Sequence, residues 1–123
     1  MKTVTPVITK EIFVEVLQDD KFLKKDTLLI FQTIYSAGKR ELSATDIAKT
    51  IGWKNKMSVV GKFVSLGKRI VKYYGIIPRE RKDGSKSYWD LFFSGYQKGN
   101  FFIFRLKPEL KKALEECYLV DNI

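Results

Sequence analysis

The chain has 123 residues, one cysteine, no histidine and a net charge of +9. Its length predicts a single domain, over 1–123, with a core that needs no disulfide or metal. The missing residue types exclude a zinc site and the Cys/His or Ser/His pairs of nucleophilic catalysis, so we expect no enzymatic activity and no cofactor. No stretch approaches the ~20 apolar residues of a membrane span and no signal peptide is recognisable, which predicts a cytoplasmic protein.

Two amphipathic helices are predicted first. One runs from Thr9, as its N-cap, to about Asp19. The next runs from Asp26, also as N-cap, to about Ala37, and Gly38 stands where a left-handed residue commonly ends a helix. Both helices carry apolar residues at helical spacing, which indicates a scaffold role.

The segment of about 43–74 has the pattern of a helix-turn-helix. Ser43 and Asp46 have the spacing of a capping box. Ala48 allows two helices to approach closely, and Gly52 permits the tight turn between them. The second helix starts at about Asn55, and its predicted core stripe is Met57, Val60, Val64, Gly67, Val71 and Tyr74. An ordinary helical hairpin is the alternative interpretation.

The opposite side of this long helix carries basic and small polar residues. The leading end of such a recognition helix meets base edges, whereas residues farther along reach flanking phosphates. The residues expected at the leading end are Asn55, Lys56, Ser58, Val59 and Lys62. Those expected farther along are Ser65, Arg69 and Lys72.

Beyond Gly75 the sequence favours β-structure. The Asp83-Gly84 pair is a strong hairpin signal, so residues 76–81 are expected to pair with 85–93, and a further strand is expected over 101–106. Basic residues flank the first turn, as in a wing that follows the phosphate backbone. These residues are Arg79, Arg81, Lys82 and Lys86.

A closing helix is predicted at about 107–118, after wing and strands over about 76–106. The sequence as a whole therefore predicts an α+β fold: a winged helix-turn-helix with an added N-terminal helix, a basic β-hairpin wing and a C-terminal helix. Tyr88, Trp89 and Phe92 lie in a segment that is apolar on both faces. The first and last helices can cover its second face, or an aromatic ring there can line a slot for an unstacked base.

The positive charge is concentrated in one part of the chain. Between Trp53 and Lys86 there are ten basic and two acidic residues, a net +8, which leaves +1 for all the others. Such a concentration is typical of a site for a polyanion such as double-stranded DNA. A solvated charged face is the alternative interpretation.

The stretches TDIAKTIG, LGKRI and YWDLFFSGYQKGNFFIFRLKPELKKAL resemble winged-helix DNA-reading modules of modification-dependent restriction endonucleases, which cut DNA carrying 5-methylcytosine. The matched features, within about 42–114, are Trp89 before an apolar pair and Gly95, an aromatic strand ending at Arg105, and PEL at 108–110. The resemblance implies the recognition domain of a restriction system, which reads methylated DNA and has a nuclease domain or subunit as its partner. The chain has no nuclease signature, so cutting is not expected.

A cytosine 5-methyl group projects into the major groove, where a short apolar side chain at a helix N-terminus can contact it. We expect Val59 to do so; Met57 lies about 200° away around the helix. A partly buried contact of Val59 with the wing is the alternative. The candidates for contact with a modified base are Val59, Tyr88 and Trp89. A sequence-specific transcriptional regulator and a winged helix that binds an acidic protein remain open as other functions.

Overall fold

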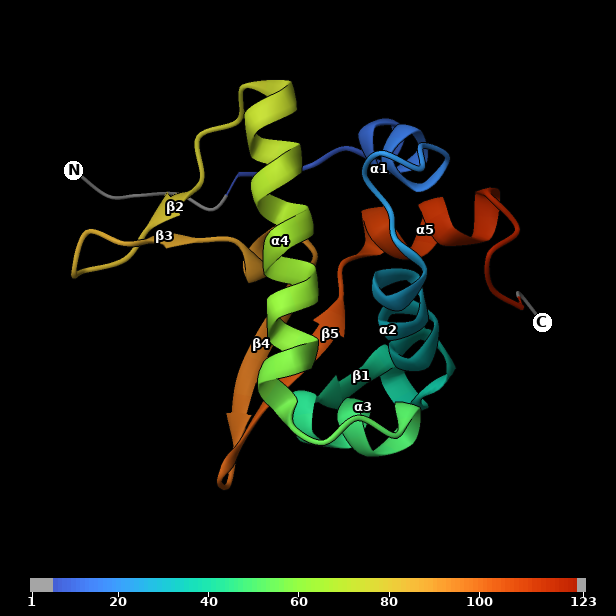
Figure 1. The fold of residues 1–123 in the computed structure, drawn as a ribbon, viewed down its shortest axis with the longest axis vertical. Helices are drawn as coiled ribbons and strands as arrows, with labels where there is room; N and C mark the ends of the chain where they lie inside the picture. Colours follow the sequence, from blue (N-terminus) through green and yellow to red (C-terminus); the bar gives the residue numbers. More distant parts are fainter. Residues whose placement is uncertain (1–5, 122–123) are drawn as a thin grey trace.

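The computed structural model describes residues 6–121, in which helices pack against a small antiparallel sheet, in agreement with the predicted α+β class (Figure 1). Helix α4 stands in front of β4 and β5, while α1, α2 and α5 lie to one side. None of the helices within the described range is both long and apolar enough to span a membrane. The helices are α1 (Lys10–Leu17), α2 (Lys25–Ser36), α3 (Ala44–Ile51), α4 (Lys56–Tyr74) and α5 (Pro108–Glu116), with short 3-10 turns η1 (Gly38–Arg40) and η2 (Trp89–Leu91). The strands are β1 (Glu41–Ser43), β2 (Arg79–Glu80), β3 (Lys86–Ser87), β4 (Phe93–Lys98) and β5 (Phe101–Leu106).

Local capping bonds define the starts of three helices as the sequence predicts. The side chains of Thr9, Ser43 and Asn55 accept hydrogen bonds from backbone N–H groups three residues ahead, at 3.1 to 3.2 Å. Each bond satisfies one of the unpaired donors in the first helical turn. Gly52 ends α3 in a left-handed conformation with φ 92°, as expected for the turn of a helix-turn-helix.

The predicted boundaries of α2 are wrong in detail. The helix starts at Lys25, so Asp26 lies in the first turn rather than at the cap. Gly38 is not left-handed; Lys39 and Arg40 are, with φ 59° and 55°. Arg40 is held there because its Nη1 donates to the Tyr35 carbonyl at 2.7 Å and its guanidinium lies 4.2 Å from the Tyr35 ring centroid.

The main sheet has the order β1-β5-β4, with all pairs antiparallel. The long hairpin predicted between 76–81 and 85–93 is wrong, because β2 and β3 pair over only two residues each, in a separate sheet. The 3-10 turn η2 interrupts the second strand, and from Phe93 the chain joins the main sheet as β4. The strand predicted over 101–106 is confirmed as β5, and its hairpin partner is β4.

The core is aromatic, and it reverses the predicted orientation of α4. The buried residues of this helix are Val59, Phe63, Leu66, Gly67 and Ile70, so only Gly67 of the predicted stripe is buried. The Phe63 ring lies 5.1 Å from that of Phe93 and 5.3 Å from that of Phe104. Burying phenylalanine, leucine and isoleucine removes more apolar area from water than burying the valines of the other stripe.

Helix α1 covers the second face of the aromatic segment at Phe92, as one of the two interpretations left open above expected, and α2 packs there as well. Phe92 is fully buried, 6.1 Å from Phe13 of α1 and 5.5 Å from Phe31 of α2, measured between ring centroids. Helix α5 buries Leu110, Ala113 and Leu114. The predicted closing helix is therefore confirmed, although it ends at Glu116.

The sheet carries an ionic contact that makes stability depend on pH. Glu41 of β1 accepts hydrogen bonds from Tyr96 and Arg105, which hold the pKa of its carboxyl below the ordinary 4.5. This stabilisation is present above the unfolded pKa and is lost as the pH falls through the lowered folded value. We expect Glu41→Gln to reduce the loss of stability measured by urea denaturation between neutral and acidic pH. The same change at the exposed Asp20, Asp20→Asn, is the control; an equal effect there would contradict the assignment.

Candidate nucleic-acid interface

Helix α4 has one side that no other element covers. This outer face consists of the exposed residues Ser58, Gly61, Ser65, Lys68 and Lys72, with Met57 and Lys62 at its edges. The helix is 19 residues long and contains no acidic residue. The sequence in fact has no carboxylate between Asp46 and Glu80. The outer face is therefore a continuous cationic and small-residue surface.

Lys68 and Lys72 supply the free charge of this face. They are four residues apart and so project from the same side of the helix. Neither makes an ion pair within residues 6–121, whereas Lys62 Nζ lies 3.4 Å from Asp26 Oδ2. The Lys68 ammonium lies 5.7 Å from the centroid of the Tyr88 ring. Lys68 was not among the predicted contacts, although its spacing from Lys72 was a signal that could have identified it.

Two predicted contacts on α4 lie elsewhere. Val59 is fully buried, so the prediction that it meets a base methyl group is wrong. Met57, which the predicted stripe put in the core, is 65% exposed instead. Arg69 is half-buried, and its Nη2 donates to the Phe22 carbonyl at 2.8 Å, so it joins α4 to the scaffold rather than pointing outward. Both corrections follow from the reversed orientation of the helix.

The leading end of α4 matches the prediction more closely. Asn55, Lys56 and Ser58 are all exposed. The Asn55 side chain is engaged in capping, since its Oδ1 accepts from the Ser58 N–H at 3.2 Å. Of the side chains predicted to contact bases at this end, Lys56 and Ser58 are thus available to a partner.

Gly61 lies at the centre of the outer face without a packing reason inside the protein. A Cβ added there would meet nothing within 4 Å. Glycine in the interior of a helix costs about 0.5–1 kcal/mol relative to alanine. We therefore expect Gly61→Ala to raise the free energy of unfolding, measured by chemical denaturation, by about that amount. Gly67→Ala, where the Cβ would lie 3.0 Å from the Tyr88 Cβ, is the contrasting variant and should destabilise. If Gly61→Ala leaves the free energy of unfolding unchanged or lowers it, the conclusion that the space beside Gly61 is open would be contradicted.

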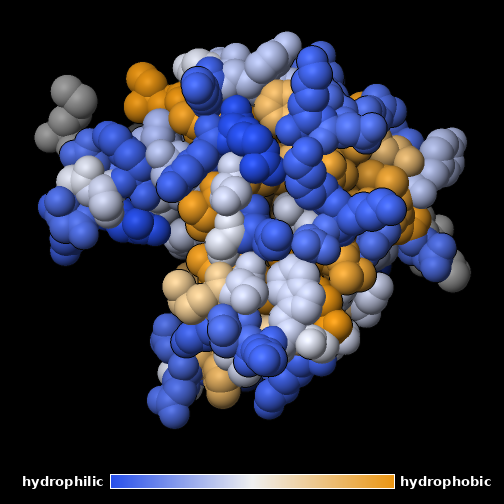
Figure 2. Space-filling model, viewed as in Figure 1, coloured by the Kyte–Doolittle hydropathy of each residue, from blue (hydrophilic) through white to orange (hydrophobic). Residues whose placement is uncertain are grey.

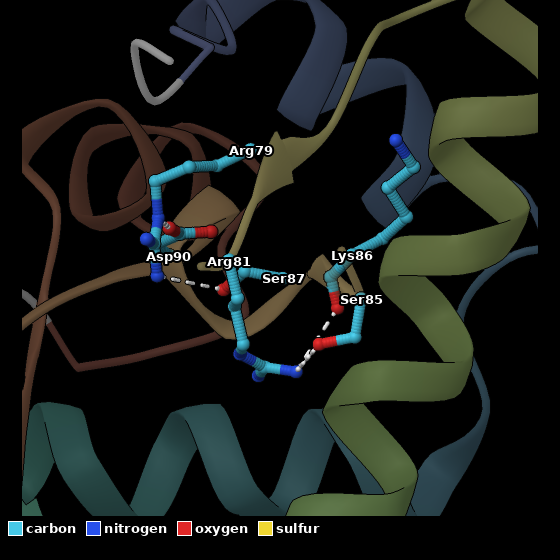
Figure 3. A network of polar contacts seen from close by, with 6 residues as sticks. All are labelled: Arg79, Arg81, Ser85, Lys86, Ser87 and Asp90. Carbon is cyan, nitrogen blue, oxygen red and sulfur yellow. Dashed lines mark hydrogen bonds and ion pairs between the residues drawn. The ribbon is translucent and has the colours of Figure 1, made fainter. Parts of the chain in front are cut away.

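The β2–β3 hairpin projects beside α4, and its base is held by an ion pair (Figures 1 and 3). Arg79 Nε lies 2.5 Å from Asp90 Oδ2, and Arg79 Nη2 donates to Ser87 Oγ at 3.2 Å. The Asp90 side chain is only 7% exposed and that of Arg79 29%. Arg79, predicted to bind DNA, is therefore an anchor of the hairpin rather than part of its tip.

The tip of the same hairpin presents the remaining predicted charges. Arg81 Nη1 donates to the Lys86 carbonyl at 3.1 Å, across the turn, as Figure 3 shows. Lys86 Nζ is 2.8 Å from Glu80 Oε2, so its charge is compensated. Arg81 and Lys82 are exposed and make no ion pair in the described part of the chain. They are the cationic groups that this projection offers.

A second projection, the β4–β5 hairpin, extends beyond the leading end of α4 (Figure 1). Its exposed side chains include Tyr96, Lys98, Phe101 and Phe102. Figure 2 shows the outline of the molecule hollowed between the two hairpins, with hydrophilic residues over both. Two hairpins thus project on the same side of α4, and the sequence predicted only the first of them as a wing.

Tyr88 and Trp89, the aromatic base candidates, are half-buried. Tyr88 packs against α4 at Gly67, and the Trp89 ring lies edge-on to Phe102 and Phe104, at 5.2 and 5.8 Å between centroids. Trp89 also borders a hollow of about 450 Å³ with Asp90 and Lys107. The Tyr88 contact holds this segment against α4, and the Trp89 contacts hold it against β5. The side of Trp89 that borders the hollow remains accessible.

Within residues 6–121 no group of three His, Cys, Asp or Glu side chains is suited to hold a metal ion. The one cysteine, Cys117, is a half-buried free thiol whose pKa is raised by burial. Comparison with protein-family models, with curated proteins and with solved structures finds no similar family, protein or structure.

Proposed function

We propose that this protein is a winged-helix domain that binds double-stranded DNA through the outer face of α4 and the two hairpins beside it. The order of elements supports the fold: α3 and α4 are joined by a left-handed glycine, and the β4–β5 hairpin shares a sheet with β1, which leads into α3. In this proposal β4–β5 is the wing, and β2–β3 is an additional basic hairpin.

The observation that carries the proposal is the outer face itself. The small exposed residues of this face, Ser58, Gly61 and Ser65, leave room for a groove to approach the helix backbone closely. Measured along the axis from Gly61 at the centre of the face, Lys68 and Lys72 lie about 10 and 16 Å away, beyond the half-width of a major groove that is ~12 Å wide. Ser58, Gly61 and Ser65 would therefore face base edges, while Lys68 and Lys72 would contact phosphates.

The exposed tip residues extend this surface. Arg81 and Lys82 at the β2–β3 tip, and Lys98 in β4, are exposed cationic groups on the two hairpins that project beside the helix. Such contacts are independent of sequence and set the register of the protein on the duplex. These phosphate contacts supply affinity, whereas the residues of α4 that face the base edges provide sequence selectivity.

Recognition of 5-methylcytosine, and a nuclease domain or subunit as partner, enter the proposal from the resemblance described above. Since Val59 is buried, Met57 is the apolar side chain at the leading end of α4 that is available to a base methyl group. The alternative function, a sequence-specific transcriptional regulator of the same fold, would instead prefer a DNA site without 5-methylcytosine.

The proposal is tested by titrating the protein with matched methylated and unmethylated duplexes, followed by fluorescence anisotropy over a salt series. We expect log affinity to fall linearly with log salt, with a slope of about −0.9 per phosphate contacted. Equal affinity for the two duplexes would overturn the proposed preference for 5-methylcytosine but leave the proposal of DNA binding intact. No binding at low salt would contradict the proposal and favour an acidic protein as the partner.

A further inference from the structure

Three exposed hydrophobic side chains meet at one end of the molecule. Met57, Phe101 and Phe102 are 65%, 50% and 36% exposed, and they come from the first turn of α4 and the start of β5. Together with Val60 and Phe104 they line a hollow of about 150 Å³. A hydrophobic hollow with exposed aromatic walls is not needed by the fold and marks a binding surface.

The Phe102 wall of this hollow is held rigidly. Its ring lies 5.2 Å from the rings of Trp89 and Phe104, between centroids. The ring also lies directly on the backbone of Gly95 in the neighbouring strand, where any Cβ would overlap it. A wall that is fixed before a ligand arrives loses little entropy on binding.

The chemistry of the hollow selects its occupant. Among the described residues that line it, Lys56 is the only charged one, and it lies at the leading end of α4, continuous with the outer face. Aromatic walls beside a cation suit a planar ring attached to a phosphate, because every nucleobase offers a π-face for stacking. We propose that this hollow receives one unpaired nucleobase of DNA bound at the outer face, with Phe101 and Phe102 stacking on the base and Lys56 near its phosphate. The inference rests on the DNA binding proposed above.

A base must leave its stack in the duplex to enter the hollow, and the free-energy cost of this step is lowest when the base has no base-pairing partner. The test therefore compares a fully paired duplex with the same duplex carrying one unpaired thymine, by anisotropy at one salt concentration. We expect the wild type to bind the second duplex about tenfold more tightly, and Phe101→Ala to make the affinities for the two duplexes equal. Tyr118→Ala, at an aromatic residue that is 92% exposed near the C-terminus, is the control and should keep the preference.

The outcomes separate the two proposals. If the wild type binds both duplexes equally, or if Phe101→Ala weakens binding to both duplexes by the same factor, the base site is overturned while DNA binding stands. Either outcome would favour an apolar protein side chain as the occupant of the hollow. No binding to either duplex would overturn DNA binding and the base site together. Photo-crosslinking from 5-iodouracil at the unpaired position checks the wild type directly: we expect attachment to Phe101, Phe102 or Met57, and attachment elsewhere would overturn the site.

Discussion

The double variant Lys68→Glu, Lys72→Glu is expected to lower the affinity for duplex DNA by about 100-fold or more. Each lysine is exposed on the outer face without an ion pair in the described residues, so each is free to contact a phosphate. Hydrogen bonds to charged groups contribute about 1.5–3 kcal/mol, so loss of two removes about 3 kcal/mol even before repulsion is counted. Because two counterions fewer are released, the slope of log affinity against log salt should fall by about 1.8.

A single variant on another helix provides the matched control. Lys112→Glu changes the net charge as much as Lys68→Glu does, and Lys112 is exposed on α5, which lies on the side of α4 opposite the β2–β3 hairpin in Figure 1. We expect this variant to leave the salt slope unchanged. If Lys112→Glu and Lys68→Glu weaken binding equally, the effect is one of overall charge, and α4 is not the interface.

Arg79→Ala is expected to lower the free energy of unfolding by about 3 kcal/mol. The substitution leaves the Asp90 carboxylate buried without its guanidinium and also removes the donor to Ser87, which is fully buried. Removing one partner of a buried ion pair commonly costs about 3–5 kcal/mol, and the partial exposure of Arg79 puts the effect at the lower end. Chemical denaturation monitored by tryptophan fluorescence measures it.

Two further variants show whether the pair itself is responsible. Arg81→Ala, in the exposed tip of the same hairpin, should cost less than about 1 kcal/mol. The double substitution Arg79→Met, Asp90→Leu should recover most of the loss, because it leaves no unpaired buried charge. A double variant as unstable as Arg79→Ala would mean that packing of the Arg79 side chain, and not its charge, holds the hairpin.

The starts of α1, α3 and α4 were predictable, although the limits of α2 were not, because these starts depend on neighbouring residues. A cap such as Ser43 satisfies a backbone donor three residues away, and Gly52 can adopt the left-handed conformation because it has no Cβ. The paired strand at 101–106 follows likewise from its run of β-formers. The location of the excess charge in the segment around α4 is a property of the sequence alone, and it predicts the surface that we propose binds DNA.

The face of α4 that is buried could not be read in the same way. Two apolar stripes share this helix, and the stripe headed by Met57 matches the helical period as well as the one formed by Val59, Phe63 and Ile70. The choice depended on Phe93 and Phe104, about 30 to 40 residues away, whose rings complete the core around Phe63. That choice buried Val59, exposed Met57, and turned Arg69 toward Phe22.

The extent of the β2–β3 hairpin was decided by tertiary structure for a similar reason. Asp83-Gly84 correctly marks a turn, but a turn signal does not say how far two strands pair. Pairing stops after Ser87 because Asp90 is drawn inward to Arg79 and Phe92 and Phe93 enter the core. The sequence by itself thus determined the elements and the charge that they carry, which arise from contacts between neighbours along the chain. Only the folded structure decided which side chains face outward, because burial is settled by residues distant in sequence that compete for one core.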